Sequence, residues 1–188
     1  MKTRKHLYLH LIPVFAFSLC LSLLFPGMNV RAERAIDIAR SSGHQLEERY
    51  QPAGSIIVEI NTGHVLWQEN PQISWEPASM SKLMTILLAY DAIQEGEFSL
   101  DTQVPVTDKY LDIAGRYSLS NNKMLAGASY TVAELIDLII VPSSAAATYM
   151  LADLIEPDPD KFVTLLNERA SSLGMKNTRY YNPVGVPN

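Results

Sequence analysis

Residues 76–85 read EPASMSKLMT and lead from a proline turn directly into the strongest helical pattern of the chain. Pro77 suits the first turn of a helix, where its missing N–H leaves no hydrogen bond unmade. The apolar residues that follow at helical spacing are Leu83, Ile86, Leu87 and Tyr90. The sequence therefore predicts a helix that ends at Gly96 and around which the rest of the chain is organised.

Ser79 and Lys82 stand three residues apart in this stretch, so on a helix their side chains are neighbours. A hydroxyl beside an amine is the minimum for nucleophilic acyl transfer, provided that the amine is neutral when it accepts the proton. Lowering a lysine pKa from about 10.4 to near 7 takes about 4 to 5 kcal/mol, which burial and a helix N-terminus could supply. A capping serine and a solvated lysine fit the S-x-x-K string equally well. Residues 120–123 read SNNK, without a helical pattern, and we interpret that second copy as chance.

The residues on either side of Ser79 favour the catalytic interpretation of Ser79 and Lys82 over the capping one. The string PASMSKLMT closely resembles the active-site turn of the penicillin-recognising D-alanyl-D-alanine carboxypeptidases, which trim peptidoglycan stem peptides. Residues 55–67 resemble the first hairpin of that family, and residues 173–178 and 182–185 resemble a later passage from helix to loop. The resemblance runs from about Pro52 to the last residue. It implies an α/β (α+β) serine-peptidase fold of the β-lactamase-like kind, with a helical subdomain and an antiparallel sheet.

The same resemblance implies Ser79 as the nucleophile and Lys82 as the general base. The family's second signature is S-x-N, whose serine helps to move protons and whose asparagine contacts the substrate backbone. Ser143 fits the serine, but Ala145 stands where the asparagine is expected and has no hydrogen-bonding side chain. Residues 120–122 match the S-x-N pattern, but they lie too near Lys82 in the sequence to serve as the second signature. Ser143 is equally compatible with a simple helix cap after a proline.

The family's third signature, K-T-G on a later strand, does not occur in the 188 residues, so further substrate-binding residues stay unknown. The expected hairpin alone makes a poor sheet with two unpaired edges. We therefore expect an incomplete sheet and favour a truncated piece of a longer enzyme over strands supplied from elsewhere.

Local signals predict the remaining elements. They are a helix over 33–40, strands over 55–60 and 64–69 around a turn at 61–63, a helical turn over 108–114, an irregular segment over 115–128, a helix over 132–140 behind a capping box, and a helix from 158–159 to 173 followed by Gly174.

Residues 1–32 have the outline of a signal peptide, because basic residues precede an apolar run from Leu11 to Phe25 and small residues offer a cleavage site. Residues 33–188 are then one partial catalytic domain. This predicts a secreted protein at the cell-envelope face of a bacterial membrane. An uncleaved N-terminus that associates with the membrane is the alternative.

Charge and cysteine usage exclude several classes of function. Loss of residues 1–32 removes four basic and no acidic residues and takes the net charge from −5 to −9, which argues against nucleic acid and anionic lipid as partners. Cys20 is the only cysteine and lies in the signal segment. His44 and His64 have no ligand partners at useful spacing, and His64 fits a solvated strand residue. We expect no metal and no organic cofactor.

Two functions from different classes follow. The first is a serine carboxypeptidase acting on stem peptides that end in D-Ala-D-Ala, with β-lactams as covalent inhibitors and with impaired or no activity in this truncated chain. The second is a non-catalytic relative that binds peptidoglycan or a wall-synthesis partner. A serine β-lactamase shares the S-x-x-K logic but fits the flanks less well.

Overall fold

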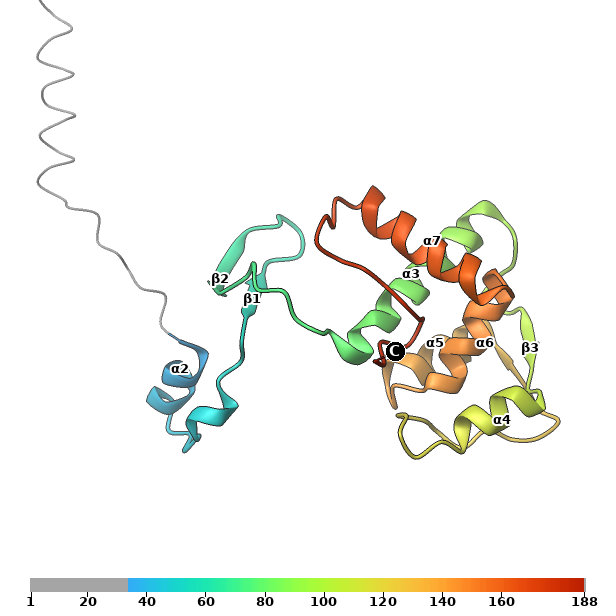
Figure 1. The fold of residues 1–188 in the computed structure, drawn as a ribbon, viewed down its shortest axis with the longest axis horizontal. Coiled ribbons are helices and arrows are strands. Elements are labelled where there is room, and N and C mark those ends of the chain that lie inside the picture. Colours follow the sequence, from blue (N-terminus) through green and yellow to red (C-terminus); the bar gives the residue numbers. More distant parts are fainter. Residues whose placement is uncertain (1–33, 188) are drawn as a thin grey trace, which may run out of the picture. The chain divides into compact units, whose positions relative to one another are not determined.

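The computed structural model describes residues 34–187, and the chain divides into two compact units, with the boundary in the sequence between Ile73 and Ser74 (Figure 1). The first unit contains α2 (Ala35–Ser41), η1 (Glu48–Tyr50), β1 (Ser55–Val58) and β2 (Val65–Glu69). The second contains η2 (Ala78–Ser81), α3 (Lys82–Glu95), β3 (Gln103–Pro105), α4 (Asp108–Ala114), β4 (Ser129–Thr131), α5 (Val132–Ile140), α6 (Ala145–Ile155) and α7 (Pro159–Ser172). The expected signal peptide lies outside the described residues, and the domain boundaries stay a prediction.

The predicted hairpin is present in the first unit. β1 pairs antiparallel with β2, so that Ile56 lies opposite Gln68 and Ile57 opposite Trp67. Gly63 has a φ of 71°, a left-handed conformation that this tight turn requires and that glycine adopts without strain.

The turn of this hairpin is held by one carboxylate. Glu59 accepts hydrogen bonds from the Thr62 hydroxyl, from the backbone N–H groups of Asn61 and Thr62, and from the Asn61 amide. These donors, the Thr62 hydroxyl first, lower the pKa of Glu59 from its ordinary value of 4.5 to about 2.

A depressed carboxyl pKa stabilises the folded turn above the ordinary pKa, and the stabilisation is lost as the pH falls from about 4.5 to about 2. We expect the Glu59 side-chain carbon to titrate near pH 2 by NMR, together with the Asn61 and Thr62 amides. The variant Glu59→Gln should remove this transition. A Glu59 midpoint near 4.5 would contradict the geometry of the turn.

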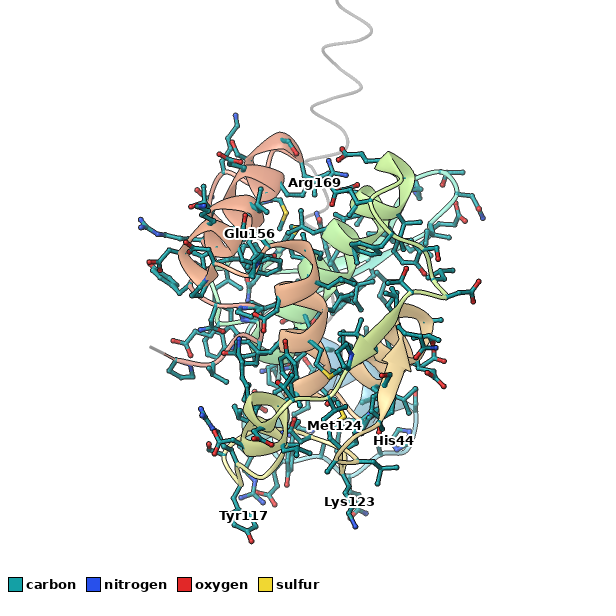
Figure 2. The ribbon with its side chains drawn as sticks, turned by 90° about the vertical axis from the view of Figure 1, so that its right-hand side faces the viewer. His44, Tyr117, Lys123, Met124, Glu156 and Arg169 are labelled. Carbon is teal, nitrogen blue, oxygen red and sulfur yellow. The ribbon has the colours of Figure 1, made fainter. Side chains whose placement is uncertain are left out.

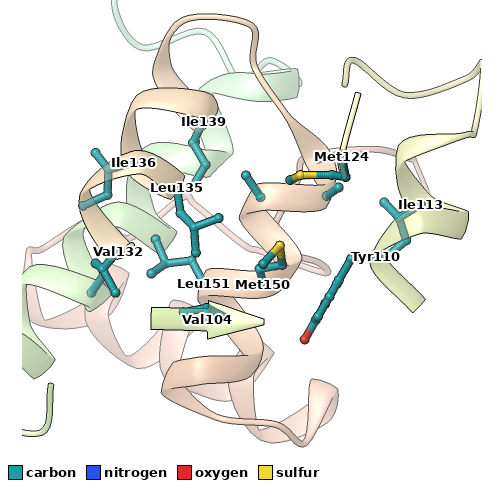
Figure 3. Close-up of a cluster of buried hydrophobic side chains, with 14 of the residues drawn as sticks. Val104, Tyr110, Ile113, Met124, Val132, Leu135, Ile136, Ile139, Met150 and Leu151 are labelled. Atoms are coloured by element: carbon teal, nitrogen blue, oxygen red, sulfur yellow. The ribbon is translucent and has the colours of Figure 1, made fainter. Parts of the chain in front are cut away.

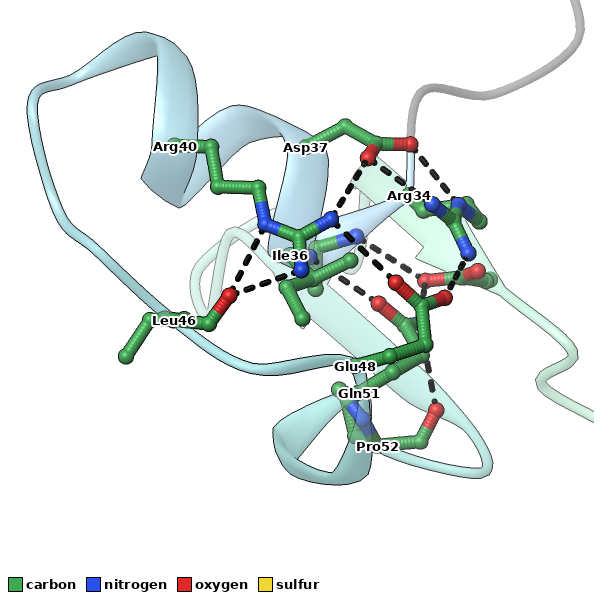
Figure 4. Close-up of polar contacts among 10 residues, drawn as sticks. Arg34, Ile36, Asp37, Arg40, Leu46, Glu48, Gln51 and Pro52 are labelled. Atoms are coloured by element: carbon green, nitrogen blue, oxygen red, sulfur yellow. Dashed lines mark hydrogen bonds and ion pairs between the residues drawn. The ribbon is translucent and has the colours of Figure 1, made fainter.

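Exposed ion pairs surround the helix of the first unit (Figure 4). Arg34 pairs with Asp37 at 2.7 Å and with Glu48, and Arg40 donates to the Leu46 carbonyl at 2.7 Å. The hydrogen bond from Arg34 lowers the pKa of Glu48. Because these groups are well exposed, water screens them and each pair adds little to the free energy of unfolding.

Helix α6 is the centre of the second unit. It packs against α3, α4, α5 and α7, and most of its residues are buried, from Ala145 to Ala152 with the exception of Tyr149. A helix that is apolar on all sides belongs inside a domain. The alanines at its start allow neighbouring backbones to come close, and larger side chains fill the rest of the core (Figure 3). Those shown there include Leu135 and Ile139 of α5, Tyr110 and Ile113 of α4, and Met150 and Leu151 of α6.

The local start signals are confirmed. The Glu134 N–H donates to the Thr131 hydroxyl at 3.1 Å, and the Thr131 N–H donates to the Glu134 carboxylate at 2.7 Å, so α5 opens with the predicted capping box. Asp158 caps α7 with Pro159 in its first turn, and Gly174 follows with a φ of 75°. The helix over 108–114 is also present.

Two features of this unit were not predicted. Leu83 and Tyr90, whose spacing indicated the helix, are 59% and 42% exposed, whereas the small residues Ala89 and Ala92 are buried. The large apolar residues therefore do not mark the buried face of α3, because α6 packs against small residues. Strand β4 was also missed, since its three residues are too few to show alternation. No helix between residues 34 and 187 is long and apolar enough to cross a membrane.

Candidate active site

Three side chains singled out in the sequence meet at the start of α3. The Lys82 Nζ lies 3.2 Å from the Ser79 Oγ, 3.0 Å from the Ser143 Oγ and 2.5 Å from the Ser143 carbonyl oxygen. An ammonium has three N–H donors, and this arrangement offers an acceptor to each. The folding of the second unit therefore joins residues that are 61 positions apart.

Lys82 is buried. Its side chain is 3% exposed, and burial lowers the pKa of Lys82 because it disfavours the charged form. Among the ion pairs formed between residues 34 and 187, none joins Lys82 to a carboxylate that would offset this effect. The alternative of a solvated surface lysine is therefore wrong.

Ser79 lies in η2, the 3-10 turn that precedes α3. Its side chain makes no capping hydrogen bond to either helix, so the capping interpretation of Ser79 is also wrong. The residue before it, Ala78, has a φ of 48°, which is uncommon for a residue with a side chain. Strained backbone of this kind persists only where the surroundings hold it in place.

The residues that hold this turn come from the far end of the described chain. Gly185, with a φ of 73°, lies so close that a Cβ added there would stand 1.9 Å from the Ala78 carbonyl oxygen. The Asn182 side-chain oxygen accepts from the Gly185 N–H at 2.8 Å, and the Thr85 hydroxyl donates to the Pro183 carbonyl at 3.3 Å. Sequence reasoning missed this role, although the Asn-Pro-x-Gly turn was a usable signal.

Ser143 is not a helix cap. The N-cap of α6 is Ser144, whose hydroxyl accepts from the Ala147 N–H at 3.2 Å. Ser143 instead has a φ of 59° and turns both its hydroxyl and its carbonyl to Lys82. The interpretation as a cap was wrong by one residue, because the sequence offers two serines in a row.

Ala145 is the first residue of α6 and is 1% exposed within the core. Its backbone N–H donates to the Ser120 carbonyl at 2.8 Å. The side-chain contact that an asparagine would offer here is absent, as the sequence indicates.

The irregular segment over 115–128 runs beside the start of α6. In Figure 2, Tyr117 and Lys123 project outward from it, whereas Met124 is 5% exposed and belongs to the core. Ser120 and Lys123 are both exposed and do not form a second copy of the Ser79–Lys82 pair. Within residues 34–187, no group of three or more His, Cys, Asp or Glu side chains could hold a metal ion.

Known proteins are similar to this chain in sequence and in fold. Residues 41–188 match the family model for D-alanyl-D-alanine carboxypeptidase, peptidase family S11. The D-alanyl-D-alanine carboxypeptidase DacF of Bacillus subtilis is 29% identical over 167 residues, which are 88% of this chain and 42% of that protein.

Solved structures agree in fold. The D-alanyl-D-alanine carboxypeptidase DacD from Francisella tularensis is 28% identical with a TM-score of 0.65, over 79% of this chain and 37% of that one. Penicillin binding protein 6B from Escherichia coli is 26% identical with a TM-score of 0.65, over 76% and 47%. The chain thus spans less than half the length of these three relatives.

These likenesses confirm the expected mixed fold of helices and small antiparallel sheets. The matched residues include Ser79, Lys82 and Ser143, so the family assignment and the site concern the same part of the chain. The chain belongs to the serine D-alanyl-D-alanine carboxypeptidases of peptidase family S11.

Proposed function

We propose that this chain carries the acylating centre of a serine D-Ala-D-Ala carboxypeptidase. Ser79 attacks the carbonyl of the penultimate D-alanine in a peptidoglycan stem peptide, terminal D-alanine leaves, and water then hydrolyses the acyl-enzyme. The observation that carries this proposal is the buried Lys82 amine between two serine hydroxyls.

In this mechanism, Lys82 and Ser143 transfer the protons. Burial favours the neutral amine of Lys82, which at 3.2 Å can take the proton of the Ser79 hydroxyl as the oxygen attacks. The Ser143 hydroxyl at 3.0 Å lies on the same nitrogen and can pass a proton to the leaving amine. The Ser143 carbonyl at 2.5 Å stabilises the charge that Lys82 carries in between.

The substrate of this proposal lies outside the cytoplasmic membrane. The protein would therefore act at the cell-envelope face, in keeping with the predicted signal peptide. β-Lactams present a strained amide to the same nucleophile, and one structural relative is named for penicillin binding. We propose that they acylate Ser79.

The direct test is labelling of the mature chain with a fluorescent penicillin, with the labelled peptide identified by mass. We expect a stable label on Ser79 that disappears in Ser79→Ala. The variant Ala145→Asn should label about tenfold faster, because a restored amide can hold the substrate backbone. Label at another residue would contradict the proposal.

Ala145 favours a second candidate, a non-catalytic relative that binds peptidoglycan or a wall-synthesis partner. Wild-type protein that takes no label but sediments with purified peptidoglycan would support this candidate. A serine β-lactamase is distinguished by turnover, because it would hydrolyse the penicillin repeatedly instead of retaining it.

A further inference from the structure

Ser143 sits immediately before the first turn of α6, and the N–H groups of that turn are all hydrogen-bonded. Free N–H groups at a helix start need partners from outside the helix. The partners are Leu138 O for Ser144 N (2.9 Å), Ser120 O for Ala145 N (2.8 Å), Asn121 Oδ1 for Ala146 N (2.9 Å) and Ser144 Oγ for Ala147 N (3.2 Å). The irregular segment therefore supplies two of the four acceptors.

Asn121 is the side chain that makes this connection. Its Oδ1 accepts from the Ala146 N–H, and its Nδ2 donates to the Ile113 carbonyl near the end of α4, each at 2.9 Å. One amide group thus ties the last turn of α4 to the first turn of α6. No helix or strand contains Asn121, so these bonds do much to fix its place.

Ser143 depends on a fixed helix start. Its φ of 59° is a sparsely populated conformation for a serine, and such a conformation relaxes when its surroundings loosen. Relaxation would turn the hydroxyl and the carbonyl of Ser143 away from the Lys82 amine together, because both belong to the same residue.

We propose that Asn121 is a positioning residue of this active site, which anchors the start of α6 and so keeps Ser143 in the conformation that serves Lys82. The inference rests on the proposed function for its catalytic consequence and on the hydrogen bonds alone for its structural part. Asn121 acts through α6 and takes no part in the chemistry.

The catalytic test compares acylation rates by fluorescent penicillin, each at the optimum pH of the variant. Asn121→Ala is expected to slow acylation on the order of tenfold to a hundredfold, since small misplacements of catalytic groups have effects of this size. Asn121→Asp keeps an acceptor for the Ala146 N–H but replaces the donor to the Ile113 carbonyl with a carboxylate oxygen, so its acylation rate should fall between those of wild type and Asn121→Ala. Asn122→Ala is the matched control, because the Asn122 amide nitrogen bonds within the segment, to the Lys123 carbonyl at 3.2 Å and the Met124 sulfur at 3.8 Å, while its oxygen has no partner. It should label at the wild-type rate.

Wild-type labelling by Asn121→Ala would overturn the proposal and leave the proposed function intact. Absence of label on the wild-type chain would instead refute the proposed function.

Amide hydrogen exchange, followed by NMR, decides the structural part in either case. Asn121→Ala should speed exchange at Ser144 and Ala145, which follow Ser143, as well as at Ala146, and Asn121→Asp should speed it less because it keeps the acceptor for the Ala146 N–H. A change confined to Ala146 would show that the anchor does not reach Ser143 and would overturn the proposal.

Discussion

Lys82→Met should slow the acylation of Ser79 by fluorescent penicillin by about 10²- to 10⁴-fold, the range that general acid–base catalysis supplies. Methionine fills a similar volume but cannot accept the hydroxyl proton. Lys123→Met is the matched control, because Lys123 occupies the same place in the second S-x-x-K string and is exposed. The control should label at the wild-type rate. Normal labelling of Lys82→Met would show that another group is the base.

The same variant separates chemistry from stability. The folded-state pKa of Lys82 is lowered, so the unfolded chain binds more protons between that pKa and 10.5, and wild-type stability rises with pH across this window. Lys82→Met should lack this rise. At neutral pH, relief of the buried amine opposes the loss of its hydrogen bonds to Ser79 and Ser143, so the variant should remain folded. A variant that is unfolded at the assay temperature would mean that the loss of label reflects unfolding.

Gly185→Ala should disrupt the active-site turn from a distance. The new methyl group would stand 1.9 Å from the Ala78 carbonyl oxygen and 2.7 Å from the Ser81 hydroxyl, and the φ of 73° would strain any side chain. Either residues 182–186 withdraw or the turn with Ser79 shifts. We expect about 2–4 kcal/mol less stability and acylation slowed by about 10²-fold.

Gly174→Ala is the control for Gly185→Ala. Gly174 has a φ of 75°, but nothing lies within 4 Å of an added Cβ. It should lose only the backbone contribution of about 1 kcal/mol and label normally. Comparison of the two melting curves and labelling rates isolates the clash with Ala78. Equal losses in both variants would show that the contact with the turn is unimportant.

Elements with local signals were predictable from the sequence. The capping pair Thr131 and Glu134 fixed the start of α5, and Asp158 with Pro159 fixed the start of α7, because these contacts join residues within one helical turn. Ser79 and Lys82 were found for the same reason.

Features that depend on distant partners were not predictable. The buried face of α3 is set by α6, which approaches small residues that no apolar periodicity marks. The parts played by Gly185 and Asn121 arise from contacts with Ala78 and Ala146, far away in sequence. The sequence motifs that contain Gly185 and Asn121 are visible in the sequence, but their contacts appear only in the folded chain.

The amine of Lys82 has one partner that belongs to the main chain, namely the carbonyl oxygen of Ser143, which does not depend on the side chain at that position. A main-chain atom therefore helps to hold the Lys82 nitrogen in place. In the proposed mechanism, the two serine hydroxyls exchange protons with that nitrogen. During evolution, replacements at position 143 would therefore change proton transfer through the Ser143 hydroxyl before they change the position of the Lys82 amine. Such a centre can lose or regain turnover by single side-chain changes while its architecture is inherited intact.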